Sequence, residues 1–184
     1  MEADEWAEYR DAAFLARVGL DRLTGPLAAF WPVRGPQWDA LGLAGESVVL
    51  VEAKAHLDEL FSPPCAAGTS SLHRIDHALN SVREALGVRG GASWTDRFYQ
   101  LANRIAHLYF LRSHGVDARL LLVGFVGDAE MGGPLDAGEW ETAYRTAAYA
   151  MGLARRHALS PFIHHVHPPV SALAHQASER PVGS

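Results

Sequence analysis

The chain has 184 residues, of which 48% are hydrophobic and 20% charged, so it has the length and composition of one globular domain with its own core. Its net charge of -5 argues against broad non-specific binding to nucleic acid, which needs a basic surface, but a local arginine-lined cleft is compatible with it. The single Cys65 excludes an internal disulfide, the acidic first residues do not resemble a secretory signal, and no apolar run reaches the ~20 residues of a membrane span. We therefore expect a cytoplasmic protein without a membrane partner.

Hydrophobic periodicity and capping residues predict an α/β protein with the following helices and strands. Helices are expected at residues 3–18, 70–86, 93–114 and 136–157. Strands are expected at residues 27–33, around Asp39, at 47–55 and at 119–126, with an edge strand within 161–169. The first three strands would form a meander. Residues 1–170 are expected to be a single domain, and residues 171–184, which are small and polar, a flexible tail.

The stretch at residues 47–55 is a hydrophobic strand that ends in two charged side chains. Because alternate side chains of a strand share a face, Glu52 and Lys54 project to the same side as Val48 and Leu50, roughly 7 Å from each other. The short segment with Asp39 can lie alongside as an antiparallel neighbour. We therefore expect Asp39, Glu52 and Lys54 to converge at one end of the sheet.

The basic residues are unevenly divided between the two types. Of sixteen Lys and Arg residues, Lys54 is the only lysine. Arginine is a planar, always protonated fork, whereas lysine is a compact charge that can approach one oxygen or one water molecule. A lysine kept at this one position favours a chemical role for it.

Asp39 followed by Glu52-Ala53-Lys54 resembles the motif of the PD-(D/E)XK nuclease superfamily. The proline that often precedes the aspartate in that family is not adjacent here, Pro36 being the nearest. The resemblance implies an α/β, restriction-endonuclease-like fold with an αβββαβ core, in which helices flank a mixed central sheet, and it covers about residues 3–157. It also implies a hydrolase that cleaves phosphodiester bonds of nucleic acid, DNA ahead of RNA, such as an endonuclease.

The resemblance also implies roles for the motif residues. Asp39 and Glu52 would hold Mg²⁺ or Mn²⁺, with the backbone carbonyl of Ala53 as a third ligand, because these hard ions prefer oxygen. Lys54 would orient or deprotonate the attacking water and offset charge on the phosphate.

Three further residues are accessory candidates by the same resemblance. Glu8 on the opening helix would add an acidic group, with Asp11 as the other acidic candidate there. On the helix after the motif strand, Gln100 would point at the site and Arg104 would contact a phosphate. The competing interpretation is an ordinary solvated helix face in each case.

Two other readings of the chain stay open. In one, the fold is that of the family but the protein does not cleave, and it binds nucleic acid or another protein. In the other, the motif is accidental, and Glu52 and Lys54 are a surface pair at a strand end. The sequence does not decide whether two copies associate as a homodimer.

Overall fold

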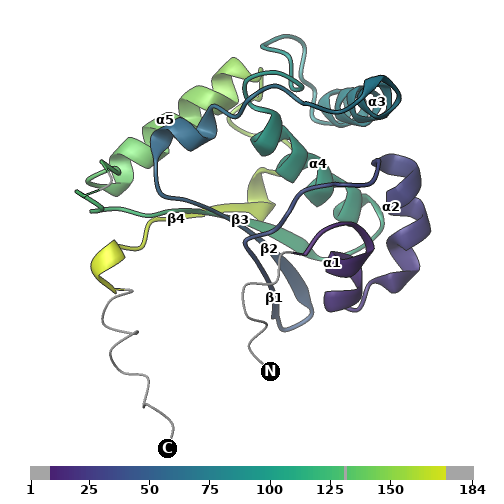
Figure 1. Ribbon diagram of the computed structural model, residues 1–184, viewed down its shortest axis with the longest axis horizontal. Helices are drawn as coiled ribbons and strands as arrows, with labels where there is room; N and C mark the ends of the chain where they lie inside the picture. The colour runs from purple at the N-terminus through teal and green to yellow at the C-terminus, as the bar shows by residue number, and fades with distance from the viewer. Residues whose placement is uncertain (1–8, 131, 173–184) are drawn as a thin grey trace, which may run out of the picture.

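A computed structural model describes residues 9–130 and 132–172, and its centre is a four-stranded sheet (Figure 1). The strand order is β1-β2-β3-β4, with β1 antiparallel to β2, and with β2, β3 and β4 parallel to one another. The protein is therefore α/β with a mixed open sheet. The strands are β1 (Ala40–Ala44), β2 (Ser47–Lys54), β3 (Ala118–Gly124) and β4 (Ile163–Val166).

The predicted alternation of β2 is confirmed. Val48, Leu50, Glu52 and Lys54 are all buried, whereas the residues between them are half-buried. The two faces differ because α4 covers the first of them, as its contacts with Glu52 and Lys54 show. β2 also lies between β1 and β3, so its backbone is paired along both edges.

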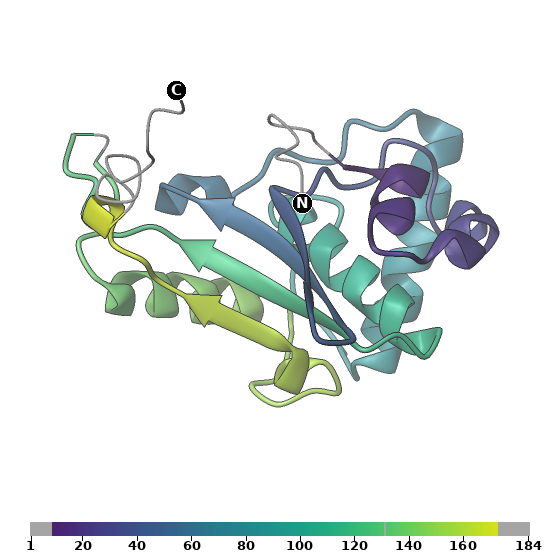
Figure 2. The same cartoon turned by 90° about the horizontal axis from the view of Figure 1, so that it is seen from below.

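Helices α3, α4 and α5 lie together on one face of the sheet, and Figure 2 shows the opposite face turned toward the viewer. α4 belongs to the long connection between β2 and β3, and α5 to that between β3 and β4, as parallel neighbours require. None of the helices in the described ranges has the length and apolarity needed to cross a membrane. The helices are α1 (Asp11–Arg17), α2 (Thr24–Phe30), α3 (Thr69–Ala85), α4 (Tyr99–Ser113) and α5 (Ala137–Ala150), with 3-10 segments η1 (Asp21–Leu23), η2 (Leu57–Leu60) and η3 (Ser160–Phe162).

The predicted strand at residues 27–33 is wrong, because most of this segment belongs to helix α2. Pro26 is the third residue of α2, within the first helical turn, where a missing N–H costs nothing. Ala28 and Ala29 then favour the helix by propensity. The expected three-stranded meander is consequently a two-stranded hairpin, β1 and β2.

Three helix boundaries also differ from expectation. Residues 93–98 form turns instead of starting α4, because the Trp94 indole donates to the Met151 carbonyl at 2.9 Å and fixes this segment against the end of α5. α5 ends at Ala150 because Gly152, with a φ of 77°, turns the chain and passes close to Gly90. Within the described part of the expected opening helix, α1 begins at Asp11, and residues 3–8 lie outside the description.

Candidate functional site

The charged end of β2 lies against helix α4, and its two charged side chains each contact a polar side chain of that helix. Lys54 Nζ is 3.1 Å from Glu52 Oε1 and 3.1 Å from Gln100 Oε1. Arg104 Nε donates to Glu52 Oε2 at 2.5 Å. The rise between Glu52 and Lys54 along the strand is about 6.6 Å, and that between Gln100 and Arg104 along the helix is about 6 Å. Because these spacings nearly match, each strand side chain meets a different helix side chain.

Glu52, Lys54 and Arg104 form a buried charge cluster. Their exposed fractions are only 4%, 7% and 8%. The two cations outnumber the one carboxylate, and that carboxylate uses both of its oxygens to bind them. Gln100, by contrast, is exposed, so the Lys54 ammonium lies one side chain below the surface.

Arg104 is held on three sides. Its Nη2 donates to the Gln37 carbonyl at 2.8 Å, and its guanidinium lies 5.0 Å from the centre of the Trp38 ring. One turn further along α4, His107 packs against Trp38 and other aromatic rings, and burial lowers the pKa of His107 to about 3. His107 is therefore neutral at pH 7, and the cation of this helix face that binds Glu52 is Arg104.

Asp39 lies where β1 begins. The regular pairing of β1 with β2 ends at Ala40, which lies opposite Val51. The next residue outward, Asp39, accepts a hydrogen bond from the Ala53 N–H at its side-chain Oδ2, at 2.7 Å. The exposed carboxylate thus continues the ladder past the end of the strand. The structure therefore brings Asp39 to the residue between Glu52 and Lys54.

The Ala53 carbonyl faces the same edge as Asp39. The Lys54 carbonyl points toward β3, because it accepts a hydrogen bond from the Phe125 N–H at 3.0 Å. Backbone groups of neighbouring strand residues point to opposite edges, so those of Ala53 point toward β1. The N–H and carbonyl of one strand residue point to the same side, and the Ala53 N–H already binds Asp39. The Ala53 carbonyl and the Asp39 carboxylate therefore both lie on the β1 side of the strand end, whereas the Glu52 side chain points into the face under α4.

This donor set fits Mg²⁺ or Mn²⁺ in chemical kind, because every candidate ligand is a hard oxygen. Within the described residues no three His, Cys, Asp or Glu side chains group as a metal site, so the fit rests on two carboxylates and one backbone carbonyl. One Glu52 oxygen is already bonded to Lys54 and the other to Arg104. A bound cation would share that carboxylate with them.

The accessory candidates have different positions. Gln100 and Arg104 both reach the motif side chains, and Arg104 does so as the partner of Glu52. Its role as a phosphate contact stays a prediction. Glu8 lies outside the described residues. Asp11 instead binds the backbone N–H groups of Arg34 and Gly35 at 2.9 and 2.8 Å.

No family model, curated protein or solved structure matches the chain.

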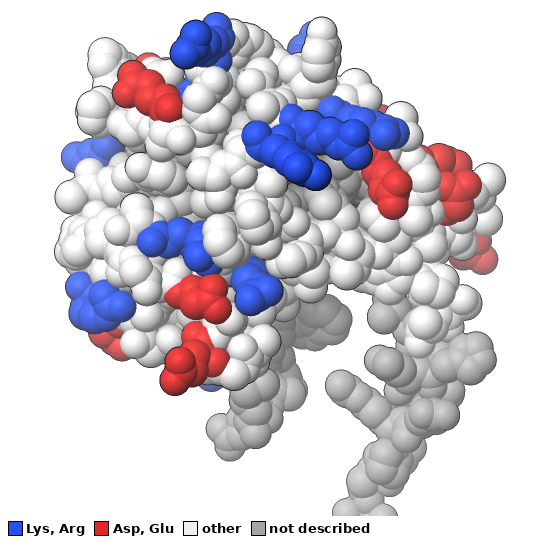
Figure 3. Space-filling view, turned by 180° about the vertical axis from the view of Figure 1, so that it is seen from behind, with Lys and Arg blue, Asp and Glu red and all other residues white. Residues whose placement is uncertain are grey.

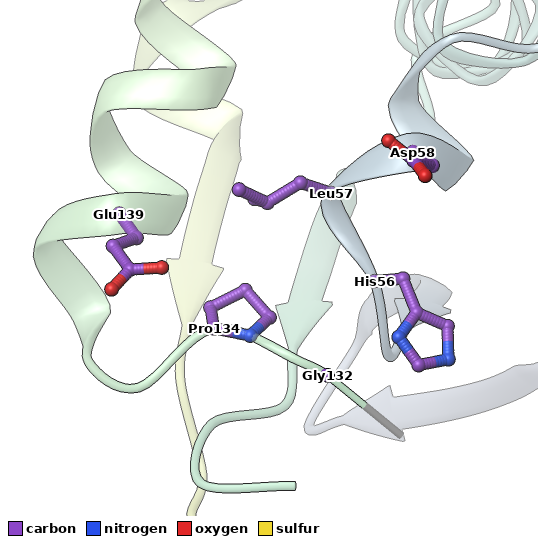
Figure 4. A pocket seen from close by; sticks show the side chains of 6 residues that line it. All are labelled: His56, Leu57, Asp58, Gly132, Pro134 and Glu139. Atoms are coloured by element: carbon purple, nitrogen blue, oxygen red, sulfur yellow. The ribbon is translucent and has the colours of Figure 1, made fainter. Parts of the chain in front are cut away.

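Sequence reasoning missed a hollow just beyond the end of β2. A cavity of about 340 Å³ lies there, and in Figure 4 the His56 and Glu139 side chains stand on opposite sides of it, with Leu57 and Pro134 between them. Glu139 comes from α5 and is far from the motif in sequence, so only the packing of α5 against η2 could reveal it. The hollow begins two residues past Lys54, and none of Asp39, Glu52 and Lys54 lines it.

Proposed function

We propose that this chain is a metal-dependent nuclease of the restriction-endonuclease-like fold, with Asp39, Glu52 and Lys54 at its centre. The observation that carries the proposal is the position of Lys54. The only lysine of the chain lies between Glu52 and Gln100, at the strand end where Asp39 binds the Ala53 N–H.

Burial of this lysine supports a chemical role, because taking an ammonium out of water costs several kcal/mol before any attraction offsets it. If the chain needed only a counter-ion for Glu52, Arg104 already supplies one at 2.5 Å. A second, compact cation is then best explained by a task for which arginine is unsuited. Donating to a single water or phosphate oxygen is such a task.

Each residue of the centre has a distinct part in the proposal. Asp39, Glu52 and the Ala53 carbonyl would hold Mg²⁺ or Mn²⁺, which when bound supplies an activated water and offsets charge on the phosphate. Lys54 would orient the water through its Nζ, and Gln100 fixes the direction of that ammonium from the solvent side. Arg104 fixes the position of Glu52 by donating to its Oε2, the oxygen that Lys54 does not bind.

A second candidate is a member of the same fold that binds nucleic acid or protein without cleaving. The observation that favours it is the engagement of both Glu52 oxygens by buried cations. In that case the charge cluster would only stabilise the packing of α4 on β2. The two candidates differ in whether the strand end binds a divalent ion.

The deciding experiment is cleavage of single- and double-stranded DNA and RNA with Mg²⁺, Mn²⁺ or EDTA, together with calorimetric titration of each metal. We expect cleavage by the wild type, loss of at least about 100-fold in Lys54→Met and Asp39→Asn, and weakened metal binding in Asp39→Asn alone. Glu46→Gln, at the exposed hairpin turn, is the matched control and should cleave normally.

Each alternative result has a definite meaning. Full activity in Lys54→Met would contradict the assignment of that residue. Metal binding without cleavage of any of these nucleic acids would contradict the proposed substrate. No metal binding by the folded wild type would overturn the nuclease and support the non-cleaving candidate.

A further inference from the structure

A groove of about 640 Å³ lies on the helix-covered side of the sheet, and neither Gln100 nor the charge cluster lines it. Its walls come from α4, α5, β3, β4 and the connection that follows α5. This volume falls within the range of small-molecule pockets, which hold about 300–1,000 Å³.

The floor of the groove is aliphatic. Leu101 and Ile105 come from α4, Leu122 from β3, and Leu153 from the loop after α5, and all four side chains are buried. On the outer wall Tyr149 is 84% exposed, an unusual position for a large aromatic ring. The surfaces together suit an apolar body more than a hydrated one.

The rim of the groove is richer in hydrogen-bond donors and positive charge than in acceptors. Arg145 and Arg155 are both exposed on it, and Arg145 Nη2 donates to the Thr142 hydroxyl at 3.2 Å. The one carboxylate in the lining is Glu141. Figure 3 shows basic side chains in small groups with acidic side chains beside them, on one face of a molecule whose net charge is -5. His157 Nδ1 accepts from the Leu159 N–H at 3.3 Å, so in the neutral ring the proton is on Nε2, a further donor.

We propose that this groove binds a small amphipathic carboxylate. The apolar body lies on the aliphatic floor, and the carboxylate meets Arg145 and Arg155 at the rim. Charge complementarity selects the anion, because two cations and one carboxylate would repel an amine and gain little from an alcohol. The inference does not depend on the nuclease proposal, since none of the proposed catalytic residues lines the groove.

Three probes that share one chain and differ only in the head group test this. Decanoate, decylamine and decanol are titrated calorimetrically against the full chain, below the micellar concentrations of the two ionic probes and below the solubility limit of decanol. We expect decanoate to bind at least about tenfold more tightly than decylamine, and its affinity to fall with added salt.

Variants assign the head group to its partners. Arg145→Gln and Arg155→Gln should each weaken decanoate about two- to fivefold and leave decanol unchanged, since exposed ion pairs contribute modestly. Arg156→Gln is the matched control, because it is the exposed neighbour of Arg155 and does not line the groove. Co-sedimentation with phosphatidylcholine vesicles that contain oleate, lost in Arg155→Gln, would identify a membrane-held carboxylate as the source of the anion, and its absence a free carboxylate.

Equal affinity for the three probes would overturn the anion site, as would equal effects of Arg155→Gln and Arg156→Gln. Failure of all three probes to bind the folded chain would overturn the groove as a ligand site.

Discussion

Replacing Glu52 by glutamine removes the only anion of the buried charge cluster. Glu52 binds Lys54 and Arg104 with separate oxygens while only 4% exposed, so the change leaves two cations in the interior with no opposite charge. Breaking a buried pair by removing one partner costs about 3–5 kcal/mol. Because a domain of this kind is stable by about 5–15 kcal/mol, we expect Glu52→Gln to lower the free energy of unfolding by a large share of the total.

Lys54→Met should behave differently, although it removes a charge from the same cluster. It leaves Glu52 and Arg104 as a balanced pair and keeps an apolar stem of similar shape. Gln100 is exposed and can bind water in place of the ammonium. The free energy of unfolding should therefore change by less than about 1 kcal/mol. The double variant should lose less than the sum of the two single changes.

The measurement is equilibrium unfolding in urea at pH 7, followed by tryptophan fluorescence and far-ultraviolet circular dichroism with a shared m-value. Glu46→Gln, an exposed glutamate of the β1–β2 turn, should stay within about 0.5 kcal/mol of the wild type. If Glu52→Gln cost no more than Glu46→Gln, or if Lys54→Met cost as much as Glu52→Gln, Glu52 would not be the anion that balances both cations.

Buried His107 should make the free energy of unfolding depend on pH. Because burial lowers the pKa of His107 from 6.5 to about 3, only the unfolded chain takes up its proton between these values, and stability falls as pH drops below the unfolded pKa. The loss from this group is about 1.4 kcal/mol at pH 5.5, measurable by urea unfolding; an unchanged pH slope in His107→Phe would contradict it. Tyr144→Phe should keep or raise the free energy of unfolding by up to about 2 kcal/mol, because within the described residues the buried hydroxyl has no hydrogen-bond partner. A loss of more than about 1 kcal/mol in thermal or urea unfolding would show that this hydroxyl has one.

The extended structure of β2, the sharing of one face by Glu52 and Lys54, and the start of α5 at Asp136 could all be predicted from the sequence. Asp136 caps α5 by accepting hydrogen bonds from the Gly138 and Glu139 N–H groups, so the helix begins within one residue of the predicted start at 136. These features depend on residues within a few positions of one another. Alternation along a strand and capping at a helix end are local, so local sequence carries them.

The membership of the charge cluster was decided by tertiary structure. Arg104 binds Glu52 across 52 positions, and its other supports, the Gln37 carbonyl and the Trp38 ring, come from a third segment. The helix at α2 replaced a predicted strand because its proline falls in the first turn, a position that apolar pattern does not reveal.

The sequence by itself determined which residues carry charge at the end of β2, and that one of them is the chain's only lysine. The tertiary structure alone decided that this end is buried under α4, and that the glutamate is shared by two cations. The physical reason is that a strand's alternation is set by its own backbone. The partner of a buried charge, in contrast, depends on which helix packs against that strand in the tertiary structure.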